Sequence, residues 1–130
     1  MISMFQDLLD MTSEQPEPQR LLFLFASTDI TRKSRKQDEK SGTITPTMVV
    51  DKLPSEITGF DELVKEADSI NKEWDFVFIA ALSGENNKAP SSEDAEVYLN
   101  RMTNDVASGN NIHRYVVFDR NQNPIEIMPH

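Results

Sequence analysis

Two uninterrupted apolar segments constrain the fold of this chain most strongly. They run from Leu21 to Ala26 and from Phe76 to Leu82. Each is far shorter than the roughly 20 apolar residues of a membrane-spanning helix. Short continuous apolar runs are typical of strands that are buried on both faces of a sheet. We therefore expect both segments to be interior strands of one sheet that helices cover.

Three further segments carry apolar residues at helical spacing. The first comprises residues 2–11, and Pro16 and Pro18 in the connector behind it cannot continue a helix. The second follows Thr58, which we expect to cap it with Asp61 as the partner in a capping box. The apolar stripe of this second helix consists of Phe60, Leu63, Val64, Ala67 and Ile70.

The third helical segment follows Ser91 or Ser92, either of which is a good helix cap, and Gly109 lies at its expected end. Its expected buried stripe consists of Ala95, Tyr98, Leu99, Met102 and Val106. Each stripe predicts a helix that buries one side against the sheet.

Two more regions complete the expected sheet. Residues 43–51 are rich in Thr and Val, and Pro46 confines that strand to a sheet edge. Residues 115–118 and 125–127 flank a polar turn and predict a hairpin. Between residues 47 and 118 the element order permits crossovers that join parallel strands. We predict an α/β fold, with α+β as the alternative: a single mixed sheet of four to five strands with about three packed helices.

The length of 130 residues is typical of one domain, residues 1–130. We expect residues 1–19 to form the N-terminal helix and its Pro-containing connector, and residues 30–43 to form an exposed charged loop. Within that loop, residues 32–40 hold five Lys or Arg residues against two acidic residues. A basic loop on an acidic chain either steers an anionic partner or is solvated without a partner.

The composition excludes several classes of function. The formal net charge of −9 argues against binding to a nucleic-acid backbone, because that affinity comes mainly from Lys and Arg. The chain has no cysteine, which excludes thiolate chemistry and favours a reducing compartment. Its first residues lack the basic start of a signal peptide. We therefore expect a cytoplasmic protein without nucleic-acid or membrane partners.

Polar residues follow the expected strands at their carboxyl ends, where open α/β sheets usually bind ligands. If the strands are parallel, these residues meet at one edge of the sheet. The candidate ligand edge consists of Asp29, Asp51, Ser83, Gly84, Lys88, Asp119 and Arg120. The alternative interpretation is that they are ordinary turn residues, at which the chain leaves the core.

The segment from Ser83 and Gly84 to the helix start at Ser91 is the most suggestive part of this edge. A loop with a glycine that leads into a helix can offer backbone N–H groups to an anion, and Lys88 adds positive charge. However, Glu85 is acidic, and neither GxxxxGK[ST] nor GxGxxG is present. A capped helix without a ligand explains the same residues.

No catalytic group stands out in the sequence. Ser83 lacks a GxSxG setting, His113 precedes a strand, and His130 is the last residue. The metal-site spacings DxDxDG and HExxH are absent. We therefore predict no catalytic residue, no metal site and no cofactor; enzymatic activity stays an open question, with a non-enzymatic role favoured.

Five segments together carry a family resemblance, namely residues 14–23, 45–52, 74–84, 89–90 and 118–120. In them the chain resembles a family of small proteobacterial proteins often labelled "ribonucleotide reductase subunit alpha". The resemblance covers nearly the whole chain and implies no particular chemistry. A reductase catalytic subunit needs a cysteine radical and a cysteine pair in a much larger barrel, so the absence of cysteine and the small size exclude that activity.

Two functional hypotheses follow. The first is a non-enzymatic protein-interaction module, which forms a homodimer or binds another protein, because a well-patterned core occurs together with exposed charged loops. The second is a site for a small molecule or a phosphate- or nucleotide-type anion at the candidate ligand edge, with or without catalysis.

Overall fold

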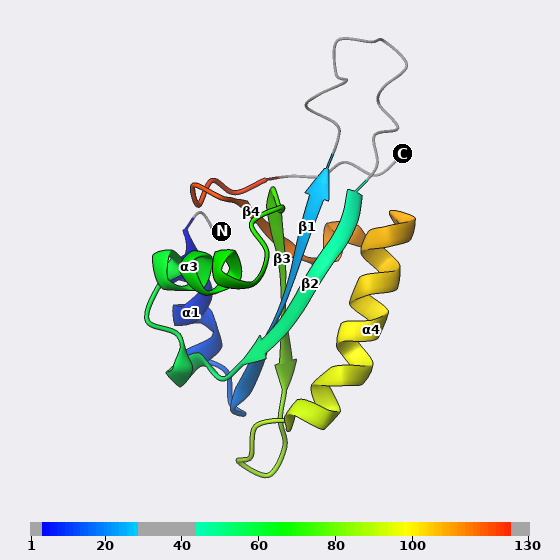
Figure 1. Cartoon of the computed structure of the whole chain (residues 1–130). Helices are drawn as coiled ribbons and strands as arrows, with labels where there is room; N and C mark the ends of the chain where they lie inside the picture. The colour runs from blue at the N-terminus through cyan, green and yellow to red at the C-terminus, as the bar shows by residue number, and fades with distance from the viewer. Residues whose placement is uncertain (1–3, 29–43, 126–130) are drawn as a thin grey trace.

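The fold is a four-stranded sheet covered by helices, in the strand order β2-β1-β3-β4 (Figure 1). The computed structural model describes residues 4–28 and 44–125. Its strands are β1 Gln19–Thr28, β2 Ile44–Lys52, β3 Phe76–Ser83 and β4 Val116–Asp119. Its helices are α1 Phe5–Ser13, η2 Pro54–Glu56, α3 Phe60–Ile70, α4 Ser92–Ser108 and η3 Ile112–Arg114, of which η2 and η3 are short 3-10 helices. The prediction of one sheet of four to five strands with about three packed helices is confirmed.

β1 and β3 are the interior strands, as the two apolar segments predict. The side chains from Leu21 to Ala26 are at most 2% exposed. Odd-numbered side chains of β1 point to one face of the sheet and even-numbered ones to the other, and each set belongs to a separate apolar cluster. Because both faces are covered, the strand carries no alternating polar residues.

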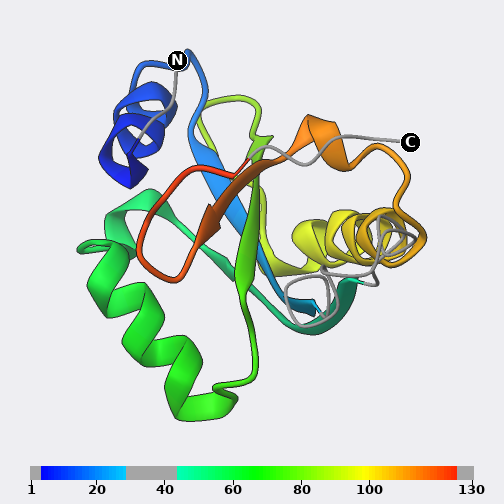
Figure 2. The same cartoon turned by 90° about the horizontal axis from the view of Figure 1, so that it is seen from above.

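α1 and α3 cover the first face of the sheet, and α4 covers the second (Figures 1 and 2). Aromatic rings fill the first face: the ring of Phe5 in α1 lies 5.5 Å from that of Phe60 in α3 and 6.3 Å from that of Phe118 in β4. The rings meet edge to face, which is a favourable arrangement for aromatic pairs. The residues that α4 buries on the second face are Ala95, Leu99, Met102 and Val106.

The ends of α3 and α4 test the predicted caps. α4 begins after Ser91, which is its N-cap, and ends at Gly109, whose φ of 78° is the left-handed conformation that favours glycine. The predicted cap of α3 at Thr58 is wrong. Gly59 occupies the N-cap position in an extended conformation, one residue later, and no side chain caps this helix.

All neighbouring strands in the described sheet run antiparallel, so the predicted parallel neighbours are wrong. The connection through α3 does join two strands that run the same way, β2 and β3, but β1 lies between them. After α4, residues 109–115 turn the chain so that β4 runs opposite to β3. The direction of each strand therefore depends on long connections rather than on the strand's own residues.

β2 is an edge strand, as Pro46 predicts. Its pairing with β1 is irregular next to this proline: Met48 lies opposite Phe25, whereas Pro46 lies opposite Ala26. Thr47 is the extra residue of this bulge, and its hydroxyl donates a hydrogen bond to the Phe25 carbonyl at 3.0 Å.

The predicted C-terminal hairpin forms within the described residues. Pro124 lies opposite Phe118, and the Ile125 N–H donates to the Val117 carbonyl at 2.9 Å. Residues 126–127 of the hairpin lie outside the described residues, as does the predicted charged loop at 30–43. Within the part of the chain that the structure describes, no helix has the length and apolar character to cross a membrane.

Two residues of the predicted apolar stripes are exposed rather than buried. Ile70 is 70% exposed and Tyr98 is 41% exposed. Ile70 is the last residue of α3, beyond the buried Ala67. Tyr98 borders the stripe of α4, in which Leu99 takes the buried position. Ile70 lines a groove between β2 and α3, and Tyr98 lines one between β3 and α4.

Candidate functional site

The candidate ligand edge is divided between the two ends of the sheet. The carboxyl ends of β2 and β3 lie at the same end, which places Asp51, Ser83 and Gly84 there. Lys88 follows in the turn after β3, where its backbone pairs with Glu85. These four candidates therefore share one end of the molecule.

The remaining candidates do not join them. Asp119 lies at the opposite end of the sheet, because it pairs with Phe76 at the start of β3. Arg120 follows Asp119 at this opposite end, and Asp29 lies outside the described residues. The convergence that parallel strands would produce does not occur among the described candidates.

Arg20 ties together the polar groups at the first end. Its Nη1 donates to the Asp51 carboxylate at 2.6 Å, and its Nε donates to the Pro90 carbonyl at 2.6 Å. The Ser92 hydroxyl donates to the same Asp51 oxygen at 2.8 Å. Asp51 is thus engaged in holding β1, β2 and the start of α4 together.

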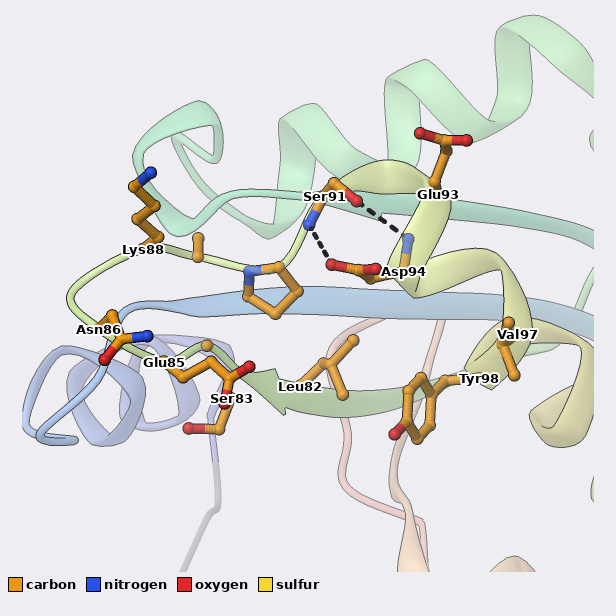
Figure 3. Close-up of a pocket in the computed structure, with 13 residues that line it drawn as sticks. Leu82, Ser83, Glu85, Asn86, Lys88, Ser91, Glu93, Asp94, Val97 and Tyr98 are labelled. Atoms are coloured by element: carbon orange, nitrogen blue, oxygen red, sulfur yellow. Dashed lines mark hydrogen bonds between the residues drawn. The ribbon is translucent and has the colours of Figure 1, made fainter.

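An open groove lies beside this network, between the end of β3 and the first turns of α4 (Figure 3). We call it the β3–α4 groove, and its volume is about 1010 Å³. Leu82, Val97 and Tyr98 form its apolar side. Its charged lining residues are Glu85, Lys88, Glu93 and Asp94. Acidic side chains outnumber Lys88, so the field of this groove opposes an anion.

The N-terminus of α4 in this groove is occupied by its own side chains (Figure 3). The Asp94 N–H donates to the Ser91 hydroxyl at 3.0 Å, and the Ser91 N–H donates to the Asp94 carboxylate at 3.2 Å. A carboxylate therefore already lies where an anion would bind. The groove does not support the anion site that the sequence suggests.

The structure explains why residue 84 is a glycine. A Cβ at this position would collide with the carbonyl of Lys88, which closes the turn over it. The Gly84 N–H also donates to the Pro18 carbonyl at 2.9 Å. The glycine thus permits a tight turn, and the close backbone approach accounts for it without a phosphate.

At the opposite end, Asp119 organises a turn. Its carboxylate accepts hydrogen bonds from the N–H groups of Asn121 and Asn123, at 2.8 and 2.9 Å, and from the side-chain amide of Asn123 at 3.0 Å. Burial by itself would raise the pKa of Asp119, but these hydrogen bonds lower it overall. The Asp119 carboxylate therefore stabilises the turn after β4.

Arg120 also has structural partners. Its guanidinium lies 4.3 Å from the centre of the Trp74 ring and donates to the Asp68 carboxylate at 2.7 Å. The Trp74 indole N–H donates to the other oxygen of Asp68 at 3.0 Å. These bonds join the end of α3 to the turn after β4, so Arg120 is not available as an anion-binding group.

A second groove lies between β2 and α3, and we call it the β2–α3 groove. Its volume is about 100 Å³. Its lining residues are Phe25, Met48, Val49, Val50, Leu63, Glu66, Ala67 and Ile70. Seven of these eight are apolar, and Ile70 is 70% exposed. Val49 lies opposite Leu24, so its side chain is on the second face, whereas Met48 and Val50 face the groove. A contiguous exposed apolar patch is a common mark of a protein-binding surface.

The outer edge of β2, which pairs with no strand within residues 4–28 and 44–125, borders this groove. The Ala26 carbonyl accepts a hydrogen bond from the Asp75 N–H, next to β3, whereas the Phe25 carbonyl accepts one from the Thr47 hydroxyl of β2. Because the backbone groups of successive residues in a strand point to opposite sides, alternate residues of β1 bond to β3 and to β2. Phe23, opposite Val50, therefore bonds to β2. It follows that the backbone N–H and C=O groups of Val49 and Asp51 point away from β1.

Sequence reasoning missed this second groove. Pro46 marks β2 as an edge, and that signal was available. The exposure of Ile70 was not visible, because its spacing matches the buried stripe of α3. Val49 was equally hidden in a strand whose faces the sequence does not distinguish.

Comparisons with known proteins add no assignment: no family model, no curated protein and no solved structure matches the chain. The resemblance to the family labelled as a reductase subunit therefore stays a prediction.

Proposed function

We propose that this chain is a protein-interaction module that captures an extended segment of another protein at the free edge of β2. The observation that carries this proposal is the combination of outward backbone groups on Val49 and Asp51, which have no strand partner in the part of the chain that the structure describes, with the apolar β2–α3 groove beside them. An added strand would satisfy these backbone groups, and the groove would receive its alternate side chains.

The polar residues elsewhere support a binding role over a catalytic one. Asp51, Asp94, Asp119 and Arg120 each bond to neighbouring protein groups that fix turns, caps or strands. His113, the histidine within the described residues, is exposed in η3. A binding surface built from backbone and apolar side chains needs none of them.

Charge favours a different protein over a second copy of this chain. α3 and α4, which flank β2, each carry four acidic residues and one basic residue. Pairing of two β2 strands would bring the acidic helices of both copies towards each other, which costs free energy. A segment with basic residues does not face this repulsion.

The test uses a blocked, fluorescein-labelled peptide with the core Lys-Thr-Val-Thr-Val-Thr-Lys, which reads the same in both directions. We expect it to bind the full chain, and we expect Val49→Pro to weaken binding about tenfold, because proline removes an outward N–H that a partner needs. Fluorescence anisotropy measures the affinity, and circular dichroism verifies that the variant is folded.

Val97→Thr is the matched control, since it changes an exposed valine in the β3–α4 groove. An unchanged affinity in this variant supports the assignment to β2. Loss of binding in V97T but not in V49P would contradict it, as would a peptide that does not bind at all. A dimer in sedimentation that V49P converts to a monomer would identify a second copy as the occupant instead.

A further inference from the structure

The β2–α3 groove also indicates the direction and charge pattern of what it binds. We propose that the bound segment runs antiparallel to β2 and carries a basic residue followed by two apolar residues at alternate positions, in the order basic-x-apolar-x-apolar. This inference rests on the proposed function.

The length of the pairing follows from the bulge in β2. Beyond the bulge, Pro46 lies opposite Ala26, whose backbone groups face β3, so Pro46 is on the outward side of β2. It has no N–H to offer a partner. An added strand can therefore pair at Val49 and Asp51 but not at Pro46. The proline limits the pairing to the half of β2 that ends at Lys52.

The apolar positions follow from the faces of β2. Met48 and Val50 pack against the first-face cluster, on the side of α3. In an added strand, the residues opposite Met48 and Val50 point to the same face. Their side chains would contact Leu63 and Ile70 of α3 across the groove. These two partner positions are separated by one residue, and both favour apolar side chains.

The basic position follows from the charges at the Lys52 end. The lining there includes Lys52 and three glutamates, Glu56, Glu62 and Glu66. Lys52 pairs with Glu66 at 2.8 Å. Glu62 has only a long contact of 3.5 Å to Lys65, with both side chains largely exposed. A net negative charge therefore remains, which complements a basic residue on the bound segment.

The direction of the bound segment relative to β2 determines the order of these positions in its sequence. Adjacent strands in the described sheet are all antiparallel, and antiparallel pairing is slightly more stable per residue than parallel pairing. In an antiparallel partner, the residue opposite Lys52 comes two positions before the residue opposite Val50. It also lies on the same face as the apolar residues. The basic residue thus precedes the apolar pair.

The test compares two blocked, labelled peptides of identical composition, one with the core Arg-Thr-Val-Thr-Val and one with Val-Thr-Val-Thr-Arg. We expect the first to bind the full chain about tenfold more tightly, as measured by fluorescence anisotropy. Equal affinities, or tighter binding of the second peptide, would overturn the proposed direction while the proposed function stands. If neither these peptides nor the symmetrical peptide bind, the proposed function itself fails.

Charge reversal tests the basic position. Glu62→Lys should weaken binding of the first peptide about threefold and should favour a peptide in which glutamate replaces its arginine. Glu93→Lys is the matched control, because it reverses an exposed carboxylate in the β3–α4 groove. Equal effects of E62K and E93K would show that only the net charge of the chain matters and would overturn the assignment to the Lys52 end.

Discussion

α3 and α4 each form one wall of a groove and each bury an apolar stripe, but their ends are held differently. α4 buries Ala95, Leu99, Met102 and Val106, and polar bonds fix both its ends: the Ser91 cap at its start, and Asp105 near its end, which accepts a hydrogen bond from the Tyr115 hydroxyl at 2.6 Å. α3 has no side-chain cap at its start; it buries Phe60, Leu63 and Ala67, and its ion pairs lie towards its end, where Glu66 pairs with Lys52 and Asp68 with Arg120.

This difference shows how a small fold can separate stability from binding. Around the β3–α4 groove, polar groups bond to one another and leave few unsatisfied sites for a ligand. Around the β2–α3 groove, the side chains are mostly apolar, and the outward backbone groups of β2 have no strand partner among the described residues. An added strand would gain contacts there without displacing a bond within the described fold, which is why the proposed function places binding at this groove.

The largest effect on stability is expected from a change in the backbone of β2, the strand that contacts both helices. Val50→Pro should lower the free energy of unfolding by about 3 kcal/mol or more, because it removes a bond to β1 inside the sheet. Val49→Pro should lower it by less than about 1 kcal/mol, since its N–H points outward. Urea unfolding of both variants measures the difference, and equal losses would contradict the assigned direction of these N–H groups.

The second test removes the polar network beside the β3–α4 groove. Arg20→Met should cost about 2 kcal/mol, because the Asp51 carboxylate and the Pro90 carbonyl both lose a donor in a partly buried site. Arg101→Met is the control, since Arg101 is exposed and its guanidinium lies over the Tyr98 ring at 5.4 Å. Thermal unfolding compares the two, and similar losses would show that the network does not stabilise α4.

The interior of the fold was predictable because burial leaves a direct record in the sequence. Leu21–Ala26 contains no polar residue and is buried on both faces, as such a run predicts. In Phe76–Leu82 the prediction of burial on both faces holds only for Val77, Phe78 and Ile79, because Ala81 is exposed where the strand passes beyond the helices. Strand direction leaves no such record, since an apolar run reads the same in either direction. The predicted ligand edge depended on direction, and for this reason its residues were divided between two ends.

The exposure of residues at the borders of the apolar helix stripes also could not be predicted from the sequence. Ile70 and Tyr98 have the spacing of buried residues, but where a helix passes the border of a sheet depends on its tertiary placement. These two residues lie in the two grooves. The rule that helical spacing of apolar residues predicts burial therefore fails at the two groove surfaces.

A smaller effect distinguishes the starts of the two helices. Ser91→Ala should cost about 1 kcal/mol, because α4 loses its cap. Thr58→Ala should cost almost nothing, since the N-cap of α3 is Gly59 and Thr58 is exposed. Amide hydrogen exchange should show faster opening of the first turn of α4 in S91A only. A comparable loss in T58A would mean that Thr58 does cap α3.

The smallest effect concerns the other end of α4 and depends on pH. Burial, followed by the hydrogen bond and the charge of Asp105, raises the pKa of Tyr115 to about 12 from its ordinary value of 10.0. Because the folded state holds this proton more tightly than the unfolded state, the stabilisation is complete below pH 10 and is lost as the pH rises towards 12. Tyr115→Phe should therefore lose less stability across this range than the wild type does.

Urea unfolding at a series of pH values from 9 to 12 measures this difference. Tyr98→Phe is the matched control, because it removes a phenolic hydroxyl from α4 itself without changing a partner of Asp105. The alkaline decline should be shallower in Y115F and unchanged in Y98F. Parallel declines in all three proteins would mean that the bond between Tyr115 and Asp105 does not hold the end of α4, and the difference between the ends of the two helices would then rest on the Ser91 cap and the Arg20 network alone.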